Sequence, residues 1–286
     1  MFKKSKLVSF PFVLVSALSI VGCGGGHSAG SVSAVRAPDS SFRGTADASS
    51  GSVVIPNSLD PAALVPNDLG LYPLSIVGMS PKTAETLTGP DGSQLRKFLY
   101  YAVGCALGKA DQFEFTWIDA HGVERNEKYK GIGGFAPNWR EAALSVREQQ
   151  MVSACLAART NWYAEHVNVS LRGSSAQSLT NSGQGTVYKV REGAYWGNLF
   201  GPNPYLRACY VPENVVYSRS QLRDCAAGHL EDDGTVSGCG MIEIVGPCNQ
   251  ACSPSSAAGI YPACLTGDNF SPNGQSTYVM ATYLHD

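Results

Sequence analysis

The sequence predicts an α+β fold with two core helices, short antiparallel strands and a loop-rich C-terminal part stapled by disulfides. Two segments repeat apolar residues every three to four positions, which is the helical period, and several other segments alternate apolar and polar residues as strands do. Six of the nine cysteines lie between residues 209 and 264. Helices and strands do not follow one another in a regular βαβ series, so a parallel α/β sheet is not expected.

The first helix is predicted from about Ser93 to Leu107, after an irregular apolar lead-in over residues 53–76 in which leucines arrive among prolines. Gly108 ends the helical pattern. The apolar face consists of Leu95, Phe98, Leu99, Ala102, Cys105 and Ala106. One such face predicts that the helix packs against the core.

A hairpin is predicted after this helix. Residues 113–117 read Phe-Glu-Phe-Thr-Trp and alternate like a half-buried strand. The segment Asp119–Gly122 can turn the chain back, and residues 124–129 then form the polar return strand.

The second helix begins at a capping box formed by Ser145 and Glu148. Its apolar stripe consists of Met151, Val152, Cys155, Leu156, Ala158 and Trp162. We expect the helix to end near Tyr163, which places Trp162 in the core.

Four later segments predict strands: 167–171, 187–195, 241–245 and 277–284. A polar loop is expected over residues 174–185. From about residue 202 to 286 the chain is rich in cysteine and poor in long apolar runs, so this part is expected to decorate the α+β core.

The beginning of the chain indicates export. Lys3, Lys4 and Lys6 precede an apolar run over residues 7–21 that is interrupted by serines and Pro11. The run is shorter than the about 20 residues that a spanning helix needs. Residues 1–22 are therefore predicted to be a signal peptide.

The end of this segment, Ile20-Val21-Gly22-Cys23, resembles the lipobox of bacterial lipoproteins. The resemblance implies that Cys23 receives a diacylglycerol and becomes the acylated first residue of the mature chain, with the membrane as a partner through this lipid. Gly24 stands where an Asp would favour retention in the inner membrane, which implies an outer-membrane address. The alternative is an ordinary cleaved signal followed by an incidental cysteine.

The mature chain divides into a tether and a domain. Residues 23–52 are rich in Gly, Ser and Ala and predict a flexible lipidated tether, with an end-to-end distance of roughly 30 Å. Residues 53–286 are expected to form a single globular domain. Removal of residues 1–22 takes three lysines and no acid from 21 basic and 23 acidic residues, which leaves 18 against 23 and a net charge of −5. No basic face is clustered, so nucleic acid is not an expected partner.

A wider pattern joins the two predicted helices and the strand that follows them. Cys105-Ala106-Leu107, then Val152-Ser153-Ala154-Cys155-Leu156 with Arg159, then Ser170-Leu171-Arg172-Gly173 resembles uncharacterised lipoproteins of soil-dwelling predatory bacteria. This resemblance implies no particular activity.

Cysteine parity predicts four disulfides. Lipidation of Cys23 leaves eight cysteines, and exported compartments are oxidising. The eight are Cys105, Cys155, Cys209, Cys225, Cys239, Cys248, Cys252 and Cys264. Cys105 and Cys155 lie on the apolar faces of the two helices, which must pack together, so we predict a bridge between them and pairing of the other six among themselves.

Zinc and calcium sites are weaker alternatives. Four thiolates, Cys239, Cys248, Cys252 and Cys264, could hold zinc, but only Cys248 and Cys252 approach the spacing of zinc ligands. The acids of Glu231-Asp232-Asp233-Gly234 are adjacent rather than spaced along a calcium loop, so a solvated turn is expected.

The histidines and tryptophans are the remaining candidates for chemistry. No two histidines have the spacing of metal ligands on one helix. The five histidines are His27, His121, His166, His229 and His285. His166 is expected at a helix end, where it can meet the last carbonyls. A Ser-His-Asp triad depends on geometry rather than chain position, but no Ser lies in a Gly-x-Ser-x-Gly elbow. The four tryptophans are Trp117, Trp139, Trp162 and Trp196. They are expected mainly in the core, whereas an exposed tryptophan would suit a binding surface.

We therefore expect an exported, lipid-anchored protein whose domain binds or scaffolds without catalysis. No cofactor is expected, and the expected partner is an envelope polymer or another protein. The alternative is a hydrolase of cell-wall or extracellular polymer whose site is assembled in space.

Overall fold

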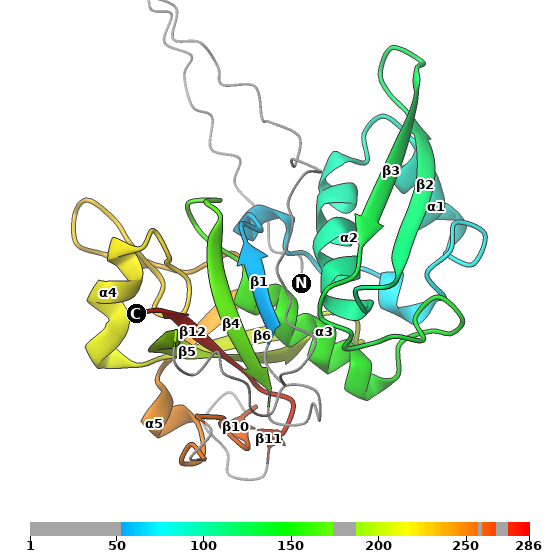
Figure 1. Ribbon diagram of the computed structural model, residues 1–286. Helices are drawn as coiled ribbons and strands as arrows, with labels where there is room; N and C mark the ends of the chain where they lie inside the picture. The colour runs from blue at the N-terminus through cyan, green and yellow to red at the C-terminus, as the bar shows by residue number, and fades with distance from the viewer. Residues whose placement is uncertain (1–52, 174–186, 257–258, 267–273) are drawn as a thin grey trace, which may run out of the picture. The chain divides into compact units, whose positions relative to one another are not determined.

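The computed structural model describes residues 53–173, 187–256, 259–266 and 274–286 and confirms the α+β class (Figure 1). Its helices are α1 (Pro81–Thr88), α2 (Ser93–Ala106), α3 (Val146–Arg159), α4 (Val215–Ser220) and α5 (Cys248–Ala251). Its longer strands are β1 (Val53–Asn57), β2 (Gln112–Ile118), β3 (Glu124–Lys130), β4 (Val167–Gly173), β5 (Tyr188–Asn198), β6 (Tyr205–Tyr210), β9 (Ile242–Pro247) and β12 (Met280–His285). Its two-residue strands are β7 (His229–Leu230), β8 (Val236–Ser237), β10 (Cys264–Leu265) and β11 (Gln275–Ser276). The finer prediction of two core helices with short strands is wrong, because five helices and a six-stranded sheet are present among the described residues.

The central sheet has the strand order β1-β4-β12-β5-β6-β9. All neighbours are antiparallel except β6 and β9. The C-terminal part contributes β6, β9 and β12 to this sheet, so it does not merely decorate a core made by earlier residues. Its last strand, β12, lies between β4 and β5 and joins the two halves of the sheet.

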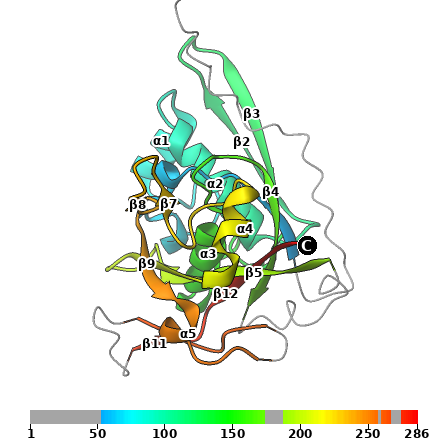
Figure 2. The same ribbon diagram turned by 90° about the vertical axis from the view of Figure 1, so that its left-hand side faces the viewer.

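The sheet is buried on both faces, and Figure 2 shows α3 and α2 on one side and α5 with β11 on the other. Tyr195 of β5 faces the large core that contains α2 and α3. The neighbouring Trp196 faces a smaller core that contains Cys209, Cys248 and Tyr261. The Cys-rich segment therefore covers the second face of the sheet, and disulfides replace part of the apolar area that a small core lacks.

The cysteines pair within the two predicted groups. Cys105 of α2 bonds to Cys155 of α3 with Cα atoms 6.0 Å apart, which confirms the predicted bridge between the two helices. The remaining pairs are Cys209–Cys248, Cys225–Cys239 and Cys252–Cys264. All four cysteines of the alternative zinc set are thus disulfide-bonded.

The second helix begins as predicted and ends earlier. The Ser145 hydroxyl accepts from Glu148 N–H, and Ser145 N–H donates to the Glu148 carboxylate, so the capping box is present. The helix ends at Arg159 because Thr160 is extended. The buried Arg159 guanidinium donates to the carbonyls of Pro56 and Tyr101, and these bonds fix the helix end against β1 and α2.

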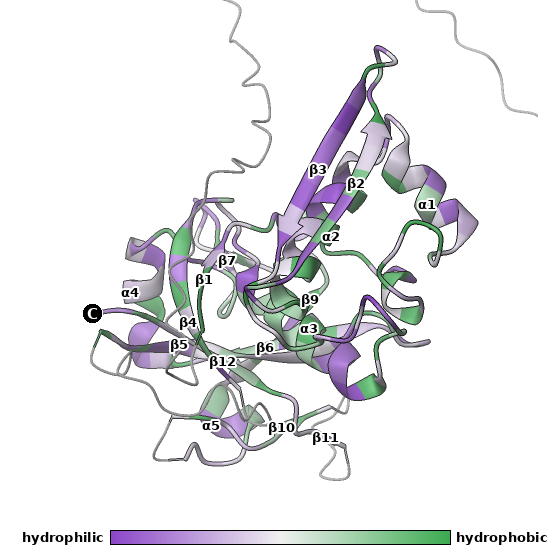
Figure 3. Ribbon diagram, turned by 45° about the vertical axis from the view of Figure 1, so that its right-hand side comes forward, coloured by the Kyte–Doolittle hydropathy of each residue, from purple (hydrophilic) through white to green (hydrophobic). Residues whose placement is uncertain are grey.

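The hairpin of β2 and β3 is confirmed and forms a separate two-stranded sheet. Tyr129 packs edge-on against Tyr100 of α2 at 5.4 Å, and the Arg96 guanidinium lies 3.6 Å from the centre of the Trp117 ring. Figure 3 shows that β3 is largely hydrophilic along its length. Within the described ranges, no helix is both long and apolar enough to cross a membrane.

Candidate functional site

A cluster of aromatic rings lies at the surface beyond the C-terminal end of α3. The Trp162 ring is stacked on the His229 imidazole, with centroids 4.3 Å apart and planes 9° apart. Tyr163 meets the same imidazole edge-on at 5.5 Å. Trp162 is 37% exposed and Tyr163 is 38% exposed. We name these three residues, together with Asp224 and Glu231, the Trp162–His229 surface.

The position of Trp162 corrects the sequence interpretation. The predicted core stripe assumed that the helix continues to Tyr163, but it ends three residues before Trp162. The tryptophan therefore leaves the stripe and enters the connection to β4, where its ring packs on His229 rather than on the core.

A buried carboxylate fixes the imidazole. His229 Nδ1 lies 3.0 Å from Asp224 Oδ2, whose side chain is almost fully buried. The other carboxylate oxygen of Asp224 accepts from Arg219 Nε at 3.1 Å. Burial, followed by the nearby Asp224 charge, raises the pKa of the Tyr163 phenol. The Asp224 carboxylate therefore sets the orientation of the His229 imidazole. The Tyr163 phenol stays protonated at neutral pH.

The outer nitrogen of the imidazole faces another carboxylate. His229 Nε2 lies 3.9 Å from Glu231 Oε2. The Ser237 hydroxyl donates to Glu231 Oε1 at 2.6 Å. The hydroxyl of Ser237, on the adjoining strand β8, is thus bonded to Glu231.

Arg223 supports this surface from the interior. Its fully buried guanidinium pairs with the buried Glu192 carboxylate at 2.8 Å. It also donates to the Ala158 carbonyl at 2.7 Å and to the Tyr195 hydroxyl at 3.0 Å. Burial lowers the pKa of Arg223, but the charges of Glu192, Tyr195 and Asp224 together outweigh burial and the net shift of this pKa is upward. Arg223 is therefore a permanent cation that joins the segment before His229 to α3 and β5.

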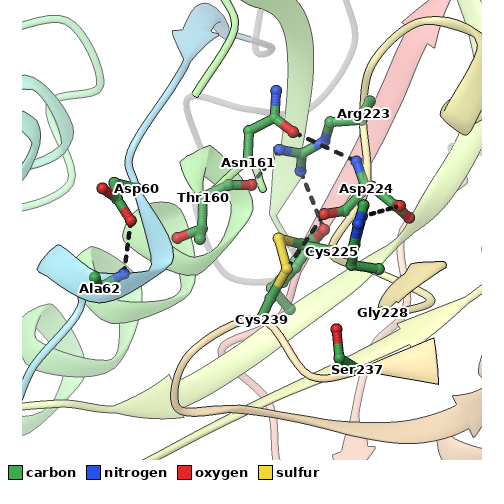
Figure 4. The surroundings of a disulfide bond; sticks show 12 residues. Asp60, Ala62, Thr160, Asn161, Arg223, Asp224, Cys225, Gly228, Ser237 and Cys239 are labelled. Carbon is green, nitrogen blue, oxygen red and sulfur yellow. Dashed lines mark hydrogen bonds and ion pairs between the residues drawn. A yellow bond between two sulfur atoms is a disulfide. The ribbon is translucent and has the colours of Figure 1, made fainter. Parts of the chain in front are cut away.

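Asn161 and a disulfide complete the support, as Figure 4 shows. The Asn161 side chain accepts from Asp224 N–H at 3.4 Å and donates to the Leu222 carbonyl at 2.9 Å. The bond between Cys225 and Cys239 closes the loop that contains His229, and Cys239 Sγ lies 3.2 Å from the Asp224 carbonyl oxygen. The segment that carries Trp162 and Tyr163 is thus bonded to the segment that carries His229, and the disulfide holds the second segment beside Asp224.

Two strained backbone positions flank this site. Ala164 has φ of 52° and Leu222 has φ of 54°, and no other non-glycine residue in the described part of the chain has a positive φ. Such angles are uncommon for residues with a Cβ atom. One of these positions follows Tyr163 and the other precedes Arg223.

Comparison with protein-family models, curated proteins and solved structures finds no match to the chain. The chemistry of the site therefore has to follow from its own residues. A histidine held by a buried aspartate is the part of a hydrolytic triad that orients the base. Acyl transfer also needs a nucleophile at the other ring nitrogen, and here that nitrogen faces Glu231. What the surface does present is an exposed indole, a phenol and a carboxylate in fixed positions.

The other tryptophans lie elsewhere. Trp139 and Trp196 are buried, as expected, and donate their indole N–H groups to the carbonyls of Tyr72 and Leu265. Trp117 is half-buried in β2 and donates to Glu127. None of these three joins the Trp162–His229 surface.

The other histidines do not converge on it either. His121 lies at the tip of the hairpin, and His285 at the end of β12 meets Tyr188 edge-on. His166 does not lie at a helix end, because α3 ends at Arg159, and its Nδ1 lies 3.2 Å from Ser58 Oγ. His27 and Cys23 fall outside the described residues.

The acidic turn is confirmed as a turn. It connects β7 to β8, and Asp233 accepts from Thr235 N–H within it. In the part of the chain that the structure describes, no group of three or more His, Cys, Asp and Glu side chains is placed to hold a metal ion.

Sequence reasoning named Trp162 and His229 separately but missed Tyr163, Arg223 and Asp224. The adjacent charges of Arg223-Asp224 before Cys225 are the one available signal, because two neighbouring charges beside a disulfide cysteine tend to be paired when buried.

Proposed function

We propose that the protein is exported, anchored by a lipid on Cys23 to the outer membrane, and that its domain binds an envelope polymer without catalysis. The observation that carries the binding proposal is the exposed Trp162 ring locked against His229. The apolar segment over residues 7–21 and the lipobox-like residues before Cys23 support the anchor.

The geometry favours a polymer of saccharide rings. Because His229 covers one face of the Trp162 ring, the exposed part of the ring belongs to its other face and its edges. A flat aromatic face beside polar groups suits a ligand that has an apolar ring face and hydroxyl groups at its rim. Glu231 and the Tyr163 hydroxyl supply these polar groups. Asp224 fixes the His229 imidazole and Ser237 fixes Glu231 before a ligand arrives, which lowers the entropy lost on binding.

Substitution Trp162→Ala is expected to weaken binding to isolated peptidoglycan sacculi or envelope polysaccharide by about tenfold or more, as loss of a central aromatic contact does. Co-sedimentation of the protein with each polymer measures this. Val77→Ala is the matched control, because Val77 is 97% exposed and also loses only apolar surface. Equal binding by the two variants would show that Trp162 does not contribute to polymer binding.

A hydrolase is the second candidate, and the contact between Asp224 and His229 is the observation that favours it. The same co-sedimentation experiment separates the two functions. Soluble fragments released from the polymer by the wild-type protein, and not by a His229→Ala variant, would show that the protein is a hydrolase. A constant amount of insoluble polymer agrees with binding.

The anchor has its own test. Substitution Cys23→Ser is expected to abolish lipidation, because the serine hydroxyl cannot replace the thiol that receives the diacylglycerol in the lipoprotein family. The protein should then leave the membrane fraction, as measured by fractionation and by mass spectrometry of the N-terminal peptide. A Ser variant that stays membrane-bound and is processed at the same site would contradict the lipobox interpretation.

A further inference from the structure

The hairpin of β2 and β3 has a free edge that the Trp162–His229 surface does not use. The two strands form their own sheet, so within the described residues β2 has only β3 as a hydrogen-bonded neighbour. Strands that end a sheet expose unpaired main-chain groups, and proteins usually cover or blunt them.

The register shows which main-chain groups point outward. Asp119 N–H donates to the Val123 carbonyl at one end of the hairpin, and Gly131 N–H donates to the Asp111 carbonyl at the other. Bonded and non-bonded pairs alternate along an antiparallel ladder. The main-chain groups of Gln112, Glu114 and Thr116 therefore point away from β3. Among the described residues, nothing pairs with these groups.

A groove runs along this edge. It consists of two adjoining hollows of about 470 Å³ and about 610 Å³, which share Ile76 and Glu114 as lining residues. Residues of β2, with Asn126 of β3, form one wall, and Ile76 and Thr88, the last residue of α1, also line the groove. Volumes of this size are typical of ligand sites. Five residues of β2 line the groove, which matches one short strand: Gln112, Phe113, Glu114, Phe115 and Thr116.

The charged side chains that line the groove also indicate which side chains its occupant carries. Glu114 is paired with Lys128 at 2.7 Å. Asp111 and Arg140 both line the larger hollow, and neither forms an ion pair within the described residues. An occupant with one basic and one acidic side chain near the same end complements both.

We propose that the edge of β2 binds an extended polypeptide segment of another protein, which adds a strand to the hairpin. Main-chain hydrogen bonds to Gln112, Glu114 and Thr116 provide the affinity, as in other cases of strand addition. An apolar side chain of the segment meets Ile76 and Phe115, and a basic and an acidic side chain meet Asp111 and Arg140. This interaction is independent of the polymer binding proposed above.

The test uses the full-length protein and the acetylated, amidated peptide Lys-Glu-Thr-Val-Thr-Val-Thr. Amide resonances of Gln112, Glu114 and Thr116 are expected to shift on titration and to become protected from hydrogen exchange. Two further peptides carry N-methyl groups on one or the other set of alternate residues. One of the two should lose binding, because only one set of N–H groups faces β2. Absence of shifts at these amides, shifts confined to other residues, or two N-methylated peptides that bind like the parent would overturn the proposal.

Position 116 provides the matched variants. Proline is tolerated in a strand where the N–H points out of the sheet, so Thr116→Pro removes one outward donor and keeps the pairing with β3. We expect peptide binding to weaken roughly fivefold or more, as loss of one hydrogen bond predicts. Thr116→Val keeps the N–H and should bind like the wild type. Equal binding by the Pro and Val variants contradicts the proposal, and if the Pro variant loses the hairpin resonances, the N-methylated peptides decide.

Discussion

Replacing Arg223 by methionine is expected to lower the free energy of unfolding by about 3–5 kcal/mol, which is the usual effect of removing one partner of a buried ion pair. The Arg223 side chain is 0% exposed and the Glu192 carboxylate that it pairs with is also buried. The substitution leaves that carboxylate without its cation. It also frees the carbonyls of Ala158 and Thr160, which accept from the guanidinium. Urea unfolding under non-reducing conditions measures the change.

Arg125 offers the matched control. It pairs with Asp119 at 2.8 Å, but its side chain is 55% exposed. Exposed ion pairs contribute about 0–1 kcal/mol, so Arg125→Met should change stability little. A second comparison is Arg223→Met combined with Glu192→Leu, which removes both charges. This double variant should be more stable than Arg223→Met alone, because no charge is left buried without a partner. Equal effects of Arg223→Met and Arg125→Met would contradict the structural role of Arg223.

The Arg223 network also explains why the sequence could not reveal the site. Asp224 and His229 are five residues apart, but Trp162 lies more than sixty residues before them. No periodic pattern connects the three. They meet because Arg223 and Asn161 bond the segment before His229 to the end of α3. Such contacts are tertiary and leave no mark on local spacing.

The fold was predictable where local physics dominates. The helical period and the capping box at Ser145 predicted α2 and α3, and strict alternation predicted the hairpin. The end of α3 was predicted four residues too late, because the apolar pattern continues past Arg159 while the buried bonds of that guanidinium stop the helix. Because of that error, the sequence prediction placed Trp162 in the core, whereas the structure places it at the surface.

The missed elements lack a simple pattern. β6 is buried on both faces, so it does not alternate. β1 contains Pro56, which argues against a central strand but is compatible with the sheet edge where β1 lies. α1 buries only Leu87 and therefore has almost no apolar face. The C-terminal part looked peripheral because its strands are short and separated by cysteines, although three of them complete the central sheet.

The bridge between Cys105 and Cys155 was predictable from the same helical faces, and it leads to the second large effect. The double variant Cys105→Ala/Cys155→Ala is expected to lose about 4 kcal/mol of stability, because the bridge closes a long loop in the unfolded chain and so reduces its entropy. The sequence separation of the two cysteines is 50 residues, and both are fully buried between α2 and α3. Urea unfolding of the oxidised protein measures the loss.

The bridge between Cys225 and Cys239 tests whether loop closure is the cause. It is also fully buried, but its sequence separation is 14 residues. The entropy model then gives about 3 kcal/mol for Cys225→Ala/Cys239→Ala, roughly 1 kcal/mol less than for the longer loop. A larger loss from the short loop than from the long one would show that native contacts at Asp224, and not the unfolded chain, dominate. A loss below about 1 kcal/mol for the Cys105 and Cys155 variant, well under the usual range, would mean that the packing of α2 on α3 holds the two helices together without the bridge.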